Sequence, residues 1–267
     1  MIHSTPVAEY PVKPSGEQSR IASHAVLFGL GAIVLGVIGF SFGDFALQWQ
    51  PVSPTLPARQ LFSVLSAAML TIGGGAVLWR KSMTPGALLL FSVFGIWVVA
   101  LHAPLILAHP LQVAQWNGTC EILALAAAAL MLLAKTTNKR SSGIRTIARL
   151  AFGVCPLVFA LAHVVYAEFT ASFVPDWIPF PLFWAYATGI GHAGGGLAIL
   201  LGVRGRLAAG LLAAMYASFA ILVHVPRIID TPSHANWLGL AITAALSGAA
   251  WIIRSAMHNE PVRGAAR

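Results

Sequence analysis

The sequence predicts an all-α membrane protein, a polytopic bundle of eight transmembrane (TM) helices arranged as two parallel four-helix repeats. Composition is the first reason. Of 267 residues, 58% are hydrophobic and 9% are charged, whereas a soluble domain has about 25% charged residues. A soluble fold of this size would leave much of that apolar surface in water, whereas a bilayer solvates it. The other two reasons are a series of long apolar segments and a likeness between the two halves of the chain.

Each apolar segment is long enough to cross ~30 Å of hydrocarbon, which takes about 20 residues of helix. The segments lie near 24–42, 60–79, 86–107, 115–134, 146–166, 181–202, 207–225 and 235–253. Turn-forming residues such as Pro51, Pro85 and Pro175 separate them. None alternates apolar and polar residues over about ten positions, as a β-barrel strand would. The segments therefore predict eight helices and no strands.

The positions of Lys and Arg predict which side of the membrane each loop faces. If the N-terminus is cytoplasmic, only Arg59 and Arg227 of the 16 basic residues fall on the outer side. Cytoplasmic loops are enriched in Lys and Arg, so this distribution supports the helix count and places the N-terminus and C-terminus in the cytoplasm. The net charge of +8 then reflects orientation, and the expected partner is the lipid bilayer and not nucleic acid.

Short stretches recur in the same order in the two halves. Residues 69–75 (MLTIGGG) align with 190–196 (IGHAGGG), and 101–104 (LHAP) align with 223–226 (VHVP). Because each unit has an even number of helices, both units run the same way through the membrane, as in parallel-repeat transporters. The predicted divisions are a cytoplasmic tail at 1–23, repeats at 24–134 and 146–254, a basic cytoplasmic linker at 135–145 and a cytoplasmic tail at 255–267.

Two stretches of the second half, residues 173–196 (FVPDWIPFPLFWAYATGIGHAGGG) and 200–209 (LLGVRGRLAA), resemble the DoxX-like family of bacterial membrane proteins. The resemblance covers roughly 160–253 and, more weakly, 42–134. Members typically have four helices, so it implies a tandem, two-repeat form in the bacterial inner membrane. It also implies a link to redox complexes. Some members resemble the quinone-reducing subunit of thiosulfate:quinone oxidoreductase, and others accompany thiol and superoxide defence enzymes.

His102 and His224 occupy matching positions, each two residues before a proline near the outer end of a predicted helix. If both face the pseudo-two-fold axis, two imidazoles could meet there and ligate a haem iron, bind a metal or flank a quinone. Alternatively, each satisfies backbone carbonyls freed by its proline. His192 lies mid-membrane among glycines, where it could bind a cofactor or make an interhelical hydrogen bond. His163 is interpreted as a packing residue.

Glu121 is the only carboxylate well inside a predicted span, about 9 Å below its outer end at ~1.5 Å per residue. A carboxyl at this depth favours its neutral form unless it is paired, which would suit a proton donor or acceptor in catalysis. Ile242 occupies the aligned place in the second half. Glu121 therefore indicates either a single site or a helix–helix hydrogen bond. Because most polar residues fall on the outer side, a site is expected to open outward.

Three functions stay open. The first is a redox-associated subunit that handles quinone, with or without haem b, where His102, His224 and His192 hold the cofactor and Glu121 moves the proton. As an enzyme it would be a quinone-linked oxidoreductase subunit. The second is a small-solute transporter with a site near His192. The third is a non-catalytic scaffold or assembly factor for membrane or periplasmic redox partner proteins. The sequence has no hydrolase, zinc-protease or nucleotide-binding motif.

Overall fold

The computed structural model of the protein describes residues 22–136 and 142–257. Most of both predicted tails and the middle of the predicted linker lie outside these residues. Within the described ranges the regular structure is entirely helical, with no strand, as the sequence predicts.

Seven helical segments of the described chain are long and apolar enough to cross a membrane, which makes this a multi-pass membrane protein. They are η1–α1 (Ser23–Ala25, Val26–Phe42), α2 (Arg59–Leu78), α3–η3–α4 (Met83–Ile96, Trp97–His102, Ala103–Ala108), α5 (Val113–Thr136), α6 (Ser142–Val165), α9–η5–α10 (Gly205–Phe219, Ala220–His224, Val225–Asp230) and α11 (His234–Ala256). Short helices η2 (Leu47–Trp49) and α7 (Ala167–Ala171) lie in connectors.

The eighth predicted span, near 181–202, is present as α8 (Pro181–Leu201). Its 21 residues suffice in length, but its glycines and His192 make it less apolar than the seven helices above. It packs between α6 and α9, within the bundle. The eight-span count therefore stays a prediction.

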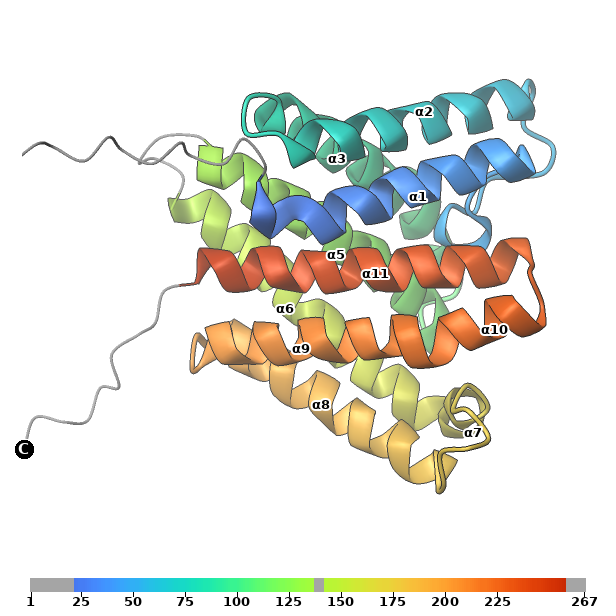
Figure 1. Ribbon diagram of the computed structural model, residues 1–267, viewed down its shortest axis with the longest axis vertical. Coiled ribbons are helices and arrows are strands. Elements are labelled where there is room, and N and C mark those ends of the chain that lie inside the picture. The colour runs from blue at the N-terminus through green and yellow to red at the C-terminus, as the bar shows by residue number, and fades with distance from the viewer. Residues whose placement is uncertain (1–21, 137–141, 258–267) are drawn as a thin grey trace, which may run out of the picture.

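Two helices form the centre of the bundle, and the others surround them (Figure 1). In the most apolar stretches of α5 and α11, 67% of the residues are buried, against 28–44% in the other spanning helices. These two helices contact each other; α1 also packs on α11, and α6 packs on α5. On one side α1, α2, α3 and α5 pack in succession, and on the other side α6, α8, α9 and α11 do so.

Two helices change their hydrogen-bond pattern just before a proline. Proline has no backbone N–H and cannot continue the i→i−4 ladder. A π-helical turn, η3 or η5, precedes Pro104 in one helix and Pro226 in the other. Such turns widen the helix and often occur at functional sites. In both helices the turn ends on a histidine, His102 or His224.

Candidate functional site

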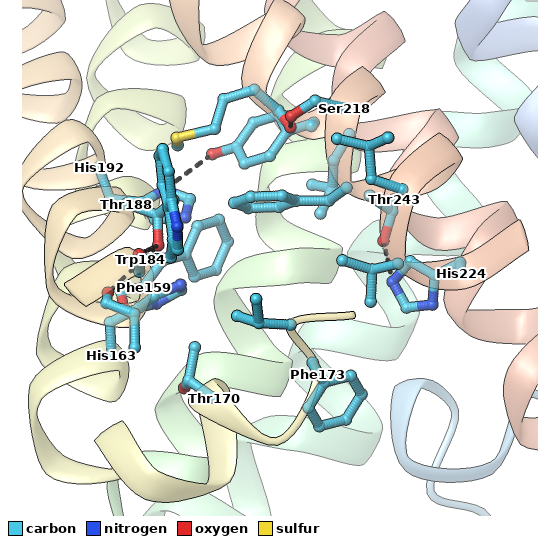
Figure 2. Close-up of a pocket in the computed structure, with 18 of the residues that line it drawn as sticks. Phe159, His163, Thr170, Phe173, Trp184, Thr188, His192, Ser218, His224 and Thr243 are labelled. Atoms are coloured by element: carbon cyan, nitrogen blue, oxygen red, sulfur yellow. Dashed lines mark hydrogen bonds between the residues drawn. The ribbon is translucent and has the colours of Figure 1, made fainter. Parts of the chain in front are cut away.

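A cavity of about 580 Å³ lies in the second half of the chain, toward the end of the bundle that carries α7 (Figure 2). Helices α5, α6, α8, α9–η5 and α11 form its walls, and residues 169–178 cover it. Aromatic and aliphatic side chains make most of the lining, which is typical of small-molecule sites. The polar side chains that also border it are Asn117, Glu121, His163, Thr170, Thr188, His192, Tyr216, Ser218, His224 and Thr243.

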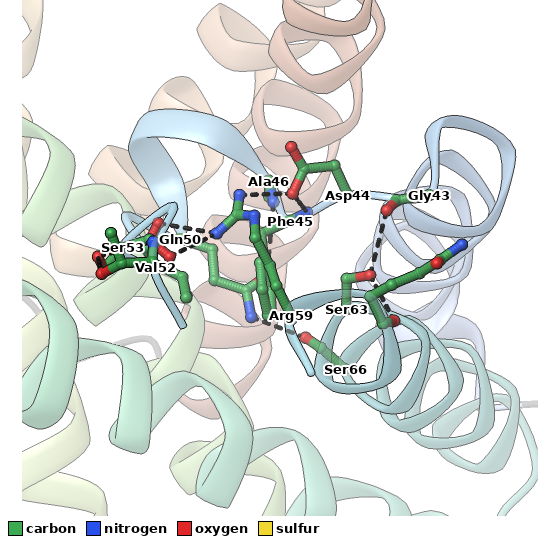
Figure 3. A network of polar contacts seen from close by, with 12 residues as sticks. Gly43, Asp44, Phe45, Ala46, Gln50, Val52, Ser53, Arg59, Ser63 and Ser66 are labelled. Carbon is green, nitrogen blue, oxygen red and sulfur yellow. Dashed lines mark hydrogen bonds and ion pairs between the residues drawn. The ribbon is translucent and has the colours of Figure 1, made fainter. Parts of the chain in front are cut away.

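In the first half of the chain, the space beside η2 is filled. Trp49 and Gln50, at the end of η2, are 8% and 6% exposed. The Gln50 amide donates a 2.9 Å hydrogen bond to Ser66 Oγ and accepts one from the backbone N–H of Ala46 (Figure 3). The hollow left there measures about 10 Å³, roughly the space of one water molecule. The described residues thus enclose a large cavity in the second half and a hollow of about one water molecule beside η2.

Two histidines and a tyrosine gather on one wall of the cavity. His163 Nδ1 lies 2.8 Å from the carbonyl oxygen of Phe159, which can only accept, so this nitrogen carries the proton. His192 is 2% exposed, and its Nδ1 lies 3.4 Å from the hydroxyl of Tyr216. The two imidazole rings are 4.8 Å apart between centroids. No other hydrogen bond from a described residue reaches Nε2 of His163 or His192, so both can serve a ligand.

A second polar group lies on the opposite wall (Figure 2). His224 Nε2 is 3.0 Å from the hydroxyl of Thr243, joining η5 to α11. The rings of Phe159 and Phe219 line the cavity beside His192, with centroids 5.5 and 6.3 Å from its imidazole, and aliphatic side chains line the cavity as well. The cavity thus has two hydrogen-bonding poles separated by an apolar slot.

Glu121 borders the cavity from α5, and both of its carboxyl oxygens accept hydrogen bonds. The indole N–H of Trp49 donates to Oε2, and the Asn117 amide donates to Oε1 at 3.1 Å. No Lys or Arg lines the cavity. Glu121 therefore combines a fixed position with access to the cavity, as a group that gives or takes a proton requires.

His102 lies outside this cavity. It is 2% exposed, and its Nε2 is 3.0 Å from the carbonyl oxygen of Trp49. Since Trp49 in turn donates to Glu121, His102 reaches Glu121 through one intervening residue. The contact satisfies a backbone carbonyl, as one sequence interpretation proposed, but the carbonyl belongs to η2 and not to a turn freed by proline.

The structure does not bring His102 and His224 together. A Cβ added to Gly118 of α5 would meet His102 Cε1 at 3.6 Å, and one added to Gly239 of α11 would meet His224 Cε1 at 2.8 Å. Each imidazole thus rests on a glycine of a different central helix, with separate hydrogen-bond partners. The predicted pair across the axis is not formed.

Haem does not fit the histidines of the cavity. Two axial imidazoles must lie on opposite faces of the macrocycle, one on each side of the iron. His163 and His192 contact each other at 4.8 Å, which leaves no space for a macrocycle between them. The Nε2 of His224 lies 3.0 Å from the hydroxyl of Thr243, so this nitrogen is engaged within the protein. Among the described residues no group of three His, Cys, Asp or Glu could hold a metal ion.

The sequence did not single out Trp184, Thr188 or Tyr216 as site residues, and it assigned His163 to packing. Trp184, Thr188 and His192 all line the cavity at four-residue spacing, which places them on one face of α8. That spacing was a usable signal. No sequence pattern indicated that Tyr216 lines the cavity, because this depends on which helix packs against α8 in the tertiary structure.

Residues 144–225 match the model of the DoxX family. This stretch includes nearly all of α6, the covering segment 169–178, α8 and α9–η5, and thus most of the cavity wall. No curated protein matches the chain, and no solved structure matches it either.

Proposed function

Because residues 144–225 of this chain form a DoxX domain, we propose that the protein is a redox-associated membrane subunit that binds a quinone in the cavity of its second half. The observation that carries the proposal is the cavity itself, an aromatic slot of about 580 Å³ with polar groups at both ends. Its volume lies within the range of about 300–1,000 Å³ that small-molecule sites occupy.

A para-quinone has a flat apolar ring and two carbonyl oxygens that point in opposite directions. The slot offers aromatic walls for the ring, including Phe159 and Phe219. At one pole His192 and Tyr216 would hold one carbonyl, and at the other His224 and Thr243 would hold the second. A ligand with two opposed acceptors can form a hydrogen bond with each pole at once, which a purely apolar ligand cannot do.

A bound quinone supplies two-electron, two-proton chemistry. In this chain Glu121 is the residue that moves a proton, because its carboxyl group borders the cavity and is oriented by Trp49 and Asn117. His102 acts on Glu121 indirectly. It bonds to the backbone carbonyl of Trp49 and thereby fixes the indole that donates a hydrogen bond to Glu121. The electrons come from a membrane or periplasmic redox partner protein, as the family resemblance implies.

The proposal includes two four-helix repeats and eight membrane spans. The packing order of the helices supports it, since α1, α2, α3 and α5 correspond to α6, α8, α9 and α11. The last helix of each unit borders the hollow of the other unit. Glu121 of α5 faces the large cavity, and Leu238 of α11 faces the small one. Both π-helical turns end on a histidine that contacts a glycine of a central helix.

The cavity faces the outer side of a bacterial inner membrane in this proposal. Arg80, Arg204 and Arg254 lie at the ends of helices opposite the end that carries α7. If these arginines mark the cytoplasmic side, then α7 and the cavity mark the outer side.

Quinone binding is tested with the purified full chain in nanodiscs, by quenching of tryptophan fluorescence with a short-chain benzoquinone. Trp184 lines the cavity, so quenching in the wild type should exceed that in Trp184→Phe. We expect His192→Gln and Tyr216→Phe to weaken binding about tenfold, which corresponds to ~1.4 kcal/mol. His109→Gln, on an exposed histidine outside the cavity, is the matched control and should bind like the wild type. Equal quenching in all variants would contradict the proposed site.

A further inference from the structure

We infer that the cavity opens sideways to the lipid bilayer, between α8 and η5, and that its ligand carries a long isoprenoid tail that leaves through this opening. The inference rests on the proposed quinone site and adds the route of entry and the residues that select for the tail. It is built from the cavity lining, the exposure of that lining and the segment that covers the cavity end.

The end of the cavity is closed by residues 166–180, which contain the covering segment 169–178. Three contacts hold residues 166–180 to the helices around them. The Tyr166 hydroxyl accepts a 3.2 Å hydrogen bond from the backbone N–H of Ala114. The Arg227 guanidinium lies 4.2 Å from the ring centroid of Phe173. The Trp184 indole donates to the carbonyl of Pro179 at 3.1 Å. A ligand from the aqueous side would have to displace several of these contacts.

The flank of the bundle, in contrast, gives access. Trp184 of α8 and Leu222 of η5 both line the cavity, and they are 44% and 39% exposed. Their neighbours Phe183 and Ile221, which do not line the cavity, are 60% and 63% exposed on the same flank. In Figure 1, α8 lies beside α9 near the end opposite α7 and diverges from α10 toward α7. We name this opening, bordered by Trp184 and Leu222, the lateral mouth.

The chemistry of the lateral mouth suits acyl or isoprenoid chains. The Thr188 hydroxyl donates to the carbonyl of Trp184 at 2.7 Å, and the Ser218 hydroxyl donates to that of Met215 at 2.7 Å. Both hydroxyls are thus satisfied within their own helices, as polar side chains near lipid must be. The remaining side chains here are the indole ring of Trp184, the branched chain of Leu222 and the thioether of Met215. They give a hydrocarbon tail an apolar path.

The position of the polar groups assigns the two parts of the ligand. The polar poles at His192 and His224 lie inside, where they hold the ring, and no comparable polar group lies at the lateral mouth to hold a second head group. A tail that follows the ring must therefore lie against Trp184 and Leu222 and continue into the bilayer. A tail that is already in lipid gains only the contacts that it makes in the mouth.

The test compares two benzoquinones with identical rings, one with a single isoprene unit and one with a long isoprenoid tail. Binding to the full chain in nanodiscs is expressed per mole of quinone in the bilayer, which removes the effect of partitioning. We expect the tailed quinone to bind at least fivefold tighter than the short one. Leu222→Trp, which narrows the lateral mouth, should remove this preference, so that the ratio of the two affinities falls to about one. Ile221→Trp, at the adjacent exposed position outside the cavity, is the matched control and should keep the preference.

Two results would overturn the inference while leaving quinone binding intact. One is equal affinity for the two quinones in the wild type, and the other is an equal effect of Leu222→Trp and Ile221→Trp. If neither quinone binds the wild type, the proposed function fails and this inference fails with it. Trp184→Ala provides a second variant that widens the mouth, and it should speed association of the tailed quinone several-fold if the mouth is the route of entry.

Discussion

The hydrogen bond between Trp49 and Glu121 joins η2 of the first half to the edge of the cavity, and its strength can be measured by a double-mutant cycle. Trp49→Phe keeps an aromatic ring but removes the indole N–H that donates to Glu121 Oε2. Glu121→Met removes the acceptor and keeps a side chain of similar length. Interhelical hydrogen bonds in membranes contribute ~0.6 kcal/mol on average and up to ~1.7 kcal/mol. Bonds to a charged group contribute about 1.5–3 kcal/mol.

We therefore expect a coupling energy of about 1–2 kcal/mol, because the donor is 8% exposed and the acceptor has one other donor, Asn117. The free energy of unfolding is measured by denaturation in mixed micelles for the wild type, both single variants and the double variant. A control cycle pairs Glu121→Met with Trp116→Phe, whose indole donates to the carbonyl of Pro110. Additive effects within ~0.5 kcal/mol are expected there. Additivity in the Trp49 cycle as well would refute the contact and the role of η2 in orienting Glu121.

Two further predictions follow from the histidines. His102→Ala should lower the free energy of unfolding by about 1–3 kcal/mol, because it leaves the buried carbonyl of Trp49 without a donor. It should also reduce the coupling energy between Trp49 and Glu121. The control His109→Ala, at an exposed residue, should change the free energy of unfolding by no more than ~0.5 kcal/mol. The purified protein should show no Soret band in oxidised or dithionite-reduced visible spectra, because the cavity histidines contact each other and leave no place for a macrocycle; a band that disappears in His163→Ala or His192→Ala would contradict this geometry.

The sequence predicts most of the fold because membrane helices are long, local and apolar. Seven of the eight predicted spans correspond to helices that meet the length and hydropathy of a membrane span, and the eighth is present as α8. The sequence did not predict the π-helical turns before Pro104 and Pro226. Proline predicts an interruption, but whether the ladder kinks or widens depends on packing with α5 and α11.

The site was predictable in part. Glu121, His192 and His224 were identified because polar side chains in apolar spans are rare and usually functional, and the structure places all three on one cavity. His102 was grouped with His224 on the strength of the sequence likeness alone. The difference between them comes from η2, where Trp49 and Gln50 fold inward and fill the first half. No local pattern shows which of two similar connectors fills its hollow and which one covers it.

The asymmetry of the two halves predicts a binding stoichiometry. In the proposed repeat, Glu121 of α5 corresponds to Ile242 of α11, and Asn117 corresponds to Leu238. The polar pair borders the cavity of about 580 Å³, whereas Leu238 borders the hollow of about 10 Å³ that Gln50 and Trp49 leave. In these two aligned pairs, the polar residues therefore lie at the hollow that has room for a ligand. We expect equilibrium titration of the full chain in nanodiscs to saturate at one quinone per chain, and Glu121→Met to weaken that one site. Saturation at two quinones of similar affinity would mean that the first half also opens, and that the inward position of Trp49 does not exclude a ligand there.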